Sequence, residues 1–363
     1  MNPKILALYL PQFHPFPEND EWWGKGFTEW TNVGRAKPLF KGHYQPRVPA
    51  DLGYYDLRIP EVREQQAQMA REAGIEGFCY WHYWFGNGKR LLDKVFAEVV
   101  ESGKPDYPFC LCWANHSWAK KTWDPTQKGK DIMLMEQTYP GVEDYTNHFY
   151  AMLPAFMDAR YMKVDGKLIF GFFAPLDVPD IKVFMDTWNK LALENGLKGF
   201  YFFGYNNRLS NLQKMKTLGL DSITMDCFFD IARSKENIVA HFIKYIGFHL
   251  LKYPYYTSYE KYVSRMLSFV NGNQSLLPCL LPNYDHSPRS ANKAILFHKS
   301  SPELWYSLLK KCIELRSNIS EDNNLIFIKA WNEWGEGNYM EPDLKYGKGY
   351  IEALRDAIKN TIK

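Results

Sequence analysis

Eight short apolar runs alternate with helix-like segments along this 363-residue chain, and that alternation most constrains its fold. Most of the runs are apolar without alternation, which is typical of parallel strands covered on their outer face. Closing eight strand–helix units predicts a single (β/α)8 TIM barrel, an α/β fold. The expected strands are residues 4–10, 75–84, 109–113, 168–173, 200–205, 222–227, 276–281 and 325–330.

The competing fold is an open, doubly wound sheet, but no Gly-rich phosphate turn follows the first strand. No linker or repeat divides the chain, so residues 1–363 are expected to form one catalytic domain with long loops at the C-terminal face. Residues 231–273, rich in aromatics and lysine, depart from the alternation after strand six. We favour an insertion that caps the barrel; the alternative is a surface that contacts a membrane or a lipid-linked glycan.

The charge and composition of the chain limit the kinds of partner that it is expected to bind. The net charge of +3, from 44 basic and 41 acidic residues with no long basic run, argues against a nucleic-acid partner. Among the 12 Trp, 24 Tyr and 24 Phe, the Trp and Tyr beside polar motifs are expected to stack on sugar rings. The six cysteines lack zinc-finger spacing, so reduced, buried thiols are expected.

The N-terminal apolar run, residues 5–10, is too short for the core of a signal peptide, and no small-residue cleavage site follows it. No apolar window approaches the roughly 18 residues that a membrane span requires. The sequence therefore predicts a cytoplasmic protein.

Polar and aromatic residues gather where the expected strands end. In a (β/α)8 barrel the C-terminal strand ends form the catalytic face, so we predict that these residues bind substrate. The repetition of this pattern over six strands is more specific than any single motif. The predicted substrate-binding residues are Tyr9, Gln12, His14, Trp30, Trp81, His82, Tyr83, Trp113, Asn115, His116, Tyr205, Asn206, Tyr284, Trp331, Asn332 and Trp334.

Two glutamates follow the eighth strand in the stretch WNEWGEG. Glu333 and Glu336 are three residues apart, and Gly335 and Gly337 favour a tight turn there. In a helical turn, residues three apart lie on one side with about 5–6 Å between their Cβ atoms. That spacing suits the carboxyl pair of a retaining glycosidase, whereas an extended chain would point the two side chains to opposite faces. We predict that both are catalytic.

Three histidines, His14, His82 and His116, follow three different strands and offer a three-histidine metal site as a minority alternative. No H-E-x-x-H motif supports a metal, so hydrogen bonding to substrate or a structural role is favoured, and no cofactor is expected. No Gly-x-Ser-x-Gly elbow is present either. The loop of residues 22–30 has two equally supported interpretations: a cover over the barrel held by its tryptophans, or a wall of the substrate site. Glu29 in this loop could bind sugar hydroxyls, but it is not assigned a catalytic role.

With these residues in view, the chain resembles the WbsX proteins, a family often called glycosyltransferase WbsX and related to glycoside hydrolase family 99. The likeness spans nearly the whole chain and is most specific at residues 331–337. It rests on YLPQFH at 9–14, GFTEW at 26–30, FCYWHYW at 78–84, CWAN at 112–115 and WNEWGEG at 331–337.

The resemblance implies a barrel that acts on α-linked mannose-type or related glycans, with Glu333 and Glu336 as the catalytic pair. It implies a retaining route in which Glu333 is the base on the substrate 2-hydroxyl, a 1,2-anhydro sugar forms, and Glu336 protonates the leaving oxygen. It also implies a setting in surface-polysaccharide (O-antigen or capsule) synthesis. An oligosaccharide or polysaccharide is therefore the expected substrate. The alternatives are a nucleotide-sugar glycosyltransferase and a non-catalytic glycan-binding barrel.

Overall fold

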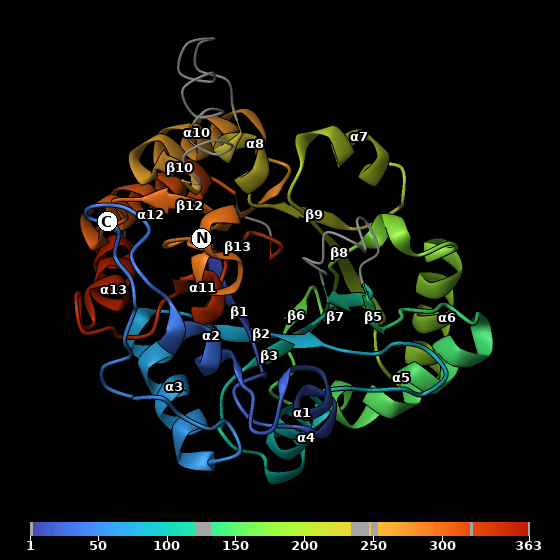
Figure 1. Ribbon diagram of the computed structural model, residues 1–363. Coiled ribbons are helices and arrows are strands. Elements are labelled where there is room, and N and C mark those ends of the chain that lie inside the picture. The colour runs from blue at the N-terminus through green and yellow to red at the C-terminus, as the bar shows by residue number, and fades with distance from the viewer. Residues whose placement is uncertain (1–2, 121–131, 234–246, 248–252, 320–321, 362–363) are drawn as a thin grey trace.

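A closed barrel of eight parallel strands forms the centre of the computed structural model, which describes residues 3–120, 132–233, 247, 253–319 and 322–361 (Figure 1). Each strand pairs with the next one in the ring, and β13 pairs with β1 to close it. The predicted (β/α)8 fold is confirmed. The barrel strands are β1 (Lys4–Tyr9), β2 (Gly77–His82), β3 (Phe109–Trp113), β7 (Lys167–Phe172), β8 (Phe200–Asn206), β9 (Ser222–Met225), β11 (Leu277–Leu280) and β13 (Leu325–Ile328).

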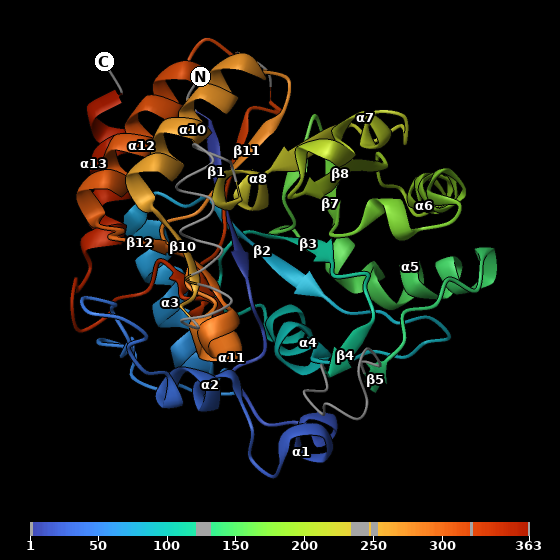
Figure 2. The same cartoon turned by 45° about the horizontal axis from the view of Figure 1, so that its top comes forward.

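Helices surround the strands on the outside of the barrel (Figure 2). Their ends follow local signals: α3 starts at Pro60 and stops at Gly74, whose φ of 88° is a left-handed conformation that suits glycine. The side chain of Ser301 accepts a hydrogen bond from the Leu304 backbone and caps α12. The barrel helices are α3 (Pro60–Ala73), α4 (Asp93–Ser102), α5 (Val142–Phe156), α6 (Ile181–Glu194), α7 (Leu212–Met215), α10 (Tyr259–Gly272), α12 (Pro302–Arg316) and α13 (Gly349–Thr361).

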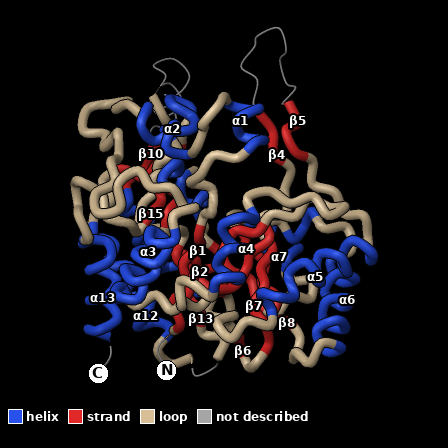
Figure 3. The backbone as a smooth tube through the Cα atoms, turned by 90° about the horizontal axis from the view of Figure 1, so that it is seen from below, coloured by secondary structure: helices blue, strands red, loops and turns tan. Residues whose placement is uncertain are grey.

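Short elements that the sequence did not predict gather at one end of the barrel. Figure 3 shows α1, α2, β4 and β5 at this end and both chain termini at the other, so these elements cover the C-terminal ends of the strands. They arise from the long loops after β1, β3, β11 and β13. They are α1 (Pro17–Trp23), α2 (Glu29–Arg35), the hairpin β4 (Trp118–Lys120) with β5 (Ile132–Met135), α11 (Ser287–Ser290), and the pair β14 (Asn332–Glu333) with β15 (Asn338–Tyr339).

The segment expected as an insertion, residues 231–273, includes helix α10, which follows β9 and packs against α12 as a barrel helix does. Ahead of α10, the segment contains the end of α8 (Phe228–Ala232) and strand β10 (Tyr255–Ser258), which pairs with β12 (Ile295–His298). Residues 234–246 and 248–252 lie outside the described part of the chain, so the extent of the insertion stays a prediction. Among the described helices, none is long and apolar enough to cross a bilayer.

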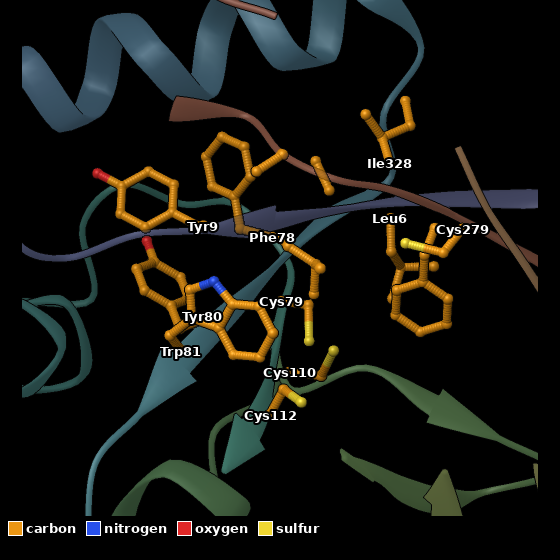
Figure 4. Packing of buried hydrophobic residues seen from close by; sticks show 14 of the residues in the cluster. Leu6, Tyr9, Phe78, Cys79, Tyr80, Trp81, Cys110, Cys112, Cys279 and Ile328 are labelled. Carbon is orange, nitrogen blue, oxygen red and sulfur yellow. The ribbon is translucent and has the colours of Figure 1, made fainter. Parts of the chain in front are cut away.

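The core shows the two-residue periodicity of strands. On β2 and β3, the sulfurs of Cys79, Cys110 and Cys112 turn to one side, while Phe78 and Tyr80 lie on the other (Figure 4). The ring of Tyr80 packs on Phe96 of α4, so that second side faces the helices. All six cysteines are buried and unpaired. Because side chains alternate, the parity of a position decides whether it can reach the inside of the barrel.

Candidate active site

A cavity of about 610 Å³ opens at the C-terminal ends of the strands. Residues that come directly after four strands line it: Leu10 after β1, Ala114 after β3, Phe173 after β7 and Lys329 after β13. The wall also contains both predicted catalytic residues, Glu333 and Glu336. The carboxylates therefore face one cavity rather than opposite faces of the chain.

A tight turn brings the two glutamates together. Trp334–Glu336 forms a 3-10 turn, in which residues three apart eclipse, so Glu333 and Glu336 lie on the same side. The turn is anchored by Asn332, whose Oδ1 accepts from Leu10 N at 2.7 Å and whose Nδ2 donates to Leu10 O at 3.0 Å. These two hydrogen bonds fix β14 against the end of β1, which sets where the first glutamate projects.

Gly335 lets a second layer of charge approach the turn closely. A Cβ at this position would collide with Oε2 of Glu29 and would come within 2.9 Å of Arg289 Nε. Gly337 has a φ of 53°, which ends the 3-10 turn in a left-handed conformation. The two glycines of WGEG are therefore required by close approach and by backbone conformation respectively.

One guanidinium connects three acidic side chains. Arg289 on α11 donates from Nη1 to Glu336 Oε1 at 2.8 Å and from Nε to Glu29 Oε2 at 3.0 Å, and its Nη2 lies 3.6 Å from Glu333 Oε2. Lys329 Nζ lies 3.7 Å from the other oxygen of Glu336. Because a single guanidinium reaches both catalytic candidates, the pair is fixed as a unit.

The surroundings of the two carboxyls shift their pKa values in opposite directions. Burial and the neighbouring Glu336 raise the pKa of Glu333 above its ordinary value, although Arg289 and Lys329 act in the other direction. Burial also raises the pKa of Glu336, but Lys329 and Arg289 outweigh it, so its pKa lies below the ordinary value. Two acids whose pKa values are pushed apart are suited to different proton-transfer roles.

A buried hydrogen-bond network behind the site holds its parts in register. Asp285 precedes α11 and bonds to His43 Nε2 at 2.8 Å and to Gln45 Nε2 at 2.7 Å, while its backbone N–H donates to the carbonyl of Glu336 at 2.7 Å. Asp285 thereby couples the segment carrying Arg289 to the turn carrying the glutamates. Burial acts to raise the pKa of Asp285, but His43 and Arg47 hold it well below its usual range.

Four predicted substrate-binding residues line the cavity: Gln12, Trp81, Tyr83 and His116. Trp81 donates its indole N–H to Glu333 Oε1 at 3.1 Å, and Gln12 Nε2 donates to Tyr83 OH at 3.0 Å. Their part in substrate binding stays a prediction, but a place in the same cavity as the two glutamates is what that role needs.

The other twelve predicted residues are absent from the cavity wall, and most contact buried protein groups instead. Trp113 and His82 point outward to α5, where His148 meets the Trp113 ring and bonds to His82 Nε2 at 2.7 Å. The hydroxyl of Tyr205 donates to Asp226, and the ring centroid of Tyr205 lies 5.4 Å from the ammonium of Lys329. Tyr205 therefore contacts a residue of the cavity wall without lining the cavity itself. The remainder are Tyr9, His14, Trp30, Asn115, Asn206, Tyr284, Trp331, Asn332 and Trp334.

Several residues of the wall were not predicted. Arg289 and Lys329 were missed, and Glu29, noted only as a possible sugar ligand, is held by Arg289 beside Glu333 and Glu336. Lys329, four residues before Glu333, could have been suspected from its position after an apolar strand, whereas Arg289 lies in no motif. The wall also includes Asn32, Arg35 and Trp118, which come from the unpredicted elements α2 and β4. Trp23 and Phe27 line it too, and both belong to residues 22–30, for which a substrate wall was one of the two predictions.

The described residues contain no group of three or more His, Cys, Asp or Glu side chains that could hold a metal ion. Of the three histidines in the alternative metal site, His116 lines the cavity, while His82 is engaged with His148 and His14 lines a separate pocket. These three residues do not converge on one point.

Comparison with solved structures shows the same fold. The chain is similar to a glycoside hydrolase family 99 endo-alpha-mannosidase from Bacteroides thetaiotaomicron, with a TM-score of 0.58 and 13% identity over 99% of this chain and 97% of the other. It is also similar to a glycoside hydrolase-like protein, with a TM-score of 0.61 and 14% identity over 98% and 94%. The fold class is thus a (β/α)8 barrel of the glycoside hydrolase family 99 kind.

The chain belongs to the family described as Glycosyltransferase WbsX, whose model matches residues 5–354. It is 33% identical over 360 residues to protein WxcX of Xanthomonas campestris pv. campestris strain B100, a match covering 98% of this chain and 49% of WxcX. The same values hold for WxcX of strain ATCC 33913. The chain spans about half the length of the curated relatives it matches.

Proposed function

We propose that this chain is a carbohydrate-active enzyme that acts on the glycosidic bonds of α-mannoside-type or related glycans, with Glu333 and Glu336 as its catalytic pair. One observation carries the proposal: both carboxylates face one cavity at the C-terminal end of the barrel and are joined by the guanidinium of Arg289. Aromatic walls and a volume of about 610 Å³ suit an oligosaccharide segment.

The proposed route retains configuration through the substrate itself. Glu333 takes the proton of the 2-hydroxyl, O2 attacks C1, and the bond from C1 to the leaving oxygen breaks as Glu336 protonates that oxygen. Water then opens the resulting 1,2-anhydro sugar at C1 while Glu336 takes a proton from the water and Glu333 returns one to O2. Both carboxyls end the cycle as they began.

The charges around the site favour the proposed role of Glu333 as base but oppose the proposed role of Glu336 as acid. The raised pKa of Glu333 supports its role as base, because a base is most effective when its pKa lies near the working pH. The ion pairs of Glu336 with Arg289 and Lys329 oppose a proton on this carboxyl. The proposal therefore requires that the leaving oxygen replace a cation as the partner of Glu336 when glycan binds.

Transfer is the second candidate, because the family is described as a glycosyltransferase. A nucleotide-sugar donor would bring a diphosphate into the cavity, and a non-catalytic barrel would bind glycan without turnover. A cytoplasmic setting in O-antigen or capsule synthesis, and contact with a membrane or a lipid-linked glycan, stay predictions.

The deciding experiment measures turnover of α-mannoside-type oligosaccharides by the wild type, Glu333→Gln and Glu336→Gln. We expect turnover by the wild type and a loss of at least about a hundredfold in each variant, with folding unchanged by circular dichroism. Full activity in both variants would refute the assignment. Tight binding of GDP or UDP in calorimetry would favour the transferase, and glycan binding without turnover would favour the binding barrel.

A further inference from the structure

A buried carboxylate behind the cavity wall takes no part in the proposed reaction. Asp226 comes directly after β9 and is fully buried. Its Oδ1 accepts a hydrogen bond from the Phe228 backbone N–H at 3.0 Å, and its Oδ2 accepts one from the hydroxyl of Tyr205. Because a buried carboxylate is costly unless a positive charge lies near it, a cation is expected close to Asp226.

The ring of Tyr205 connects Asp226 to a cation of the cavity wall. The ammonium of Lys329 lies over this ring, 5.4 Å from its centroid, while the hydroxyl of the same ring donates to Asp226. A phenol that donates to a carboxylate carries more electron density on its ring, and a ring attracts a cation through that density. Asp226 therefore attracts Lys329 both through its own charge and through the ring of Tyr205.

The contact of Lys329 with Glu336 is looser than that of Arg289 with Glu336. Lys329 Nζ lies 3.7 Å from Oε2 of Glu336, beyond hydrogen-bond distance, whereas Arg289 donates to Oε1 at 2.8 Å. Oε2 is buried, and it has no hydrogen-bond partner among the described residues. The ammonium of Lys329 is thus shared between Glu336 and the pair of Tyr205 and Asp226.

The charges around Lys329 agree with this sharing. Burial acts to lower the pKa of Lys329, but Glu336 and then Asp226 outweigh burial and hold its pKa above the ordinary value. Burial raises the pKa of Asp226, and Lys329 is the strongest influence in the opposite direction. Asp226 is therefore a second anion that Lys329 balances. The charged and titratable groups that act on Lys329 are chiefly Glu336, Asp226, Glu333, Cys279 and Tyr205.

We propose that Asp226 and Tyr205 are positioning residues, which attract the ammonium of Lys329 away from full pairing with Glu336 and so let Oε2 of Glu336 carry the proton for the leaving oxygen. This inference rests on the proposed function, in which the leaving oxygen replaces a cation as the partner of Glu336. Asp226 provides a second partner for that cation. Neither Asp226 nor Tyr205 lines the cavity, so both act through Lys329 without touching the reacting atoms.

The first test measures the ammonium without any substrate. Competitive labelling with acetic anhydride over a series of pH values, followed by mass spectrometry, measures the pKa of Lys329. Asp226→Asn removes one anion, so we expect this pKa to fall and labelling at neutral pH to become about threefold to tenfold faster. Tyr205→Phe keeps the ring but loses the bond to Asp226, and should have a smaller effect in the same direction. Asp144→Asn, a change at a buried aspartate on α5, is the matched control and should be labelled as the wild type.

The second test measures the reaction. Without the charge of Asp226, Lys329 pairs more fully with Glu336, and the pKa values of Glu333 and Glu336 should both fall. We expect kcat of Asp226→Asn to decrease by about tenfold with little change in KM, and the pH profile of kcat/KM to move to lower pH by about half a pH unit. Lys329→Met, which removes the ammonium itself, should move the profile the other way. A residue that only supports the fold would lower activity without moving the profile.

The outcomes separate this role from the catalytic proposal. Unchanged labelling of Lys329 in Asp226→Asn and Tyr205→Phe, or an unchanged pH profile in a folded and active Asp226→Asn, overturns the positioning role and leaves the catalytic pair in place. If Asp226→Asn does not fold, the labelling and the pH profile of Tyr205→Phe decide in the same way. Faster labelling of Lys329 in variants of a protein that turns over no glycan upholds the coupling of Asp226 to Lys329 and refutes the proposed catalysis.

Discussion

Arg289 donates to Glu336 across 2.8 Å from a helix of only four residues, although Glu336 comes 47 residues later in the sequence. The same side chain bonds to Glu29, 260 residues earlier, and approaches Glu333. The charge state of Glu333 and Glu336, the proposed catalytic pair, therefore depends on how the loop after β11 folds over the loop after β13. The backbone hydrogen bond from Asp285 to Glu336 joins those two loops directly.

Removing this guanidinium should cost both stability and activity. In Arg289→Met, three largely buried carboxylates lose their shared partner, and we expect the free energy of unfolding to fall by about 2–4 kcal/mol. Urea unfolding at neutral pH measures it. Arg58→Met, which breaks the exposed pair with Asp56, is the control and should cost no more than about 1 kcal/mol. Equal effects of the two changes would contradict a central role for Arg289.

The pH dependence of kcat/KM should show the effect of Lys329 on the two glutamates. This ammonium lowers the pKa of both Glu333 and Glu336, so Lys329→Met should raise both values. A base works only when deprotonated, so the acidic limb of kcat/KM should move to higher pH, by about one unit or more. Lys190→Met, a change at an exposed lysine on α6, should leave the limb in place. An unchanged limb in Lys329→Met would show that the ammonium does not set these pKa values.

The barrel could be predicted because its signal is local. Each buried parallel strand is a run of apolar residues, and signals such as Pro60 and Gly74 mark helix ends, so eight units are readable without knowing how they meet. The turn that contains Glu333 and Glu336 could also be predicted from a local signal, because the glycines that favour it lie within the turn. The elements α1, α2 and α11 contain few residues, and their positions depend on contacts across the barrel mouth.

The candidate site was only partly predictable, because a strand end alone does not say which side chains face inward. Trp81 points into the cavity, whereas its neighbour His82 points to α5, and Trp113 shares that outward direction. A shift of one residue along the strand decides whether a side chain faces the cavity or the surrounding helices. Arg289 had no signal at all, since its partners are brought to it only by the tertiary fold.

Gly335 provides a steric test of the site. A methyl group there would collide with Glu29 Oε2 and crowd Arg289 Nε, so Gly335→Ala should push both away from the turn and reduce turnover by at least about tenfold. The control is Gly34→Ala on α2, where nothing lies within 4 Å of a new Cβ. That change should leave activity intact and stabilise the helix by up to about 1 kcal/mol. Normal turnover in Gly335→Ala would show that this close approach does not matter.

Glu341 should make stability depend on pH. It is buried and accepts from Trp334 Nε1 at 2.6 Å and Gln66 Nε2 at 2.6 Å, yet burial dominates and raises its pKa from 4.5 to about 7. Between those values the folded protein keeps a proton that the unfolded chain has released, so stability falls as pH rises through this window. At 1.36 kcal/mol per pKa unit, the full effect is on the order of 3 kcal/mol.

Glu341→Gln removes this titration. The stability of the variant should therefore increase relative to that of the wild type as pH rises from 4.5 to 7, and the difference in the free energy of unfolding should stay constant above that range. Urea unfolding of both proteins at a series of pH values measures the difference. Glu352→Gln, an exposed change on α13, should track the wild type. A difference between Glu341→Gln and the wild type that stays flat across the window would mean that Glu341 is ionised in the folded protein. Its hydrogen bonds to Trp334 and Gln66 would then outweigh burial.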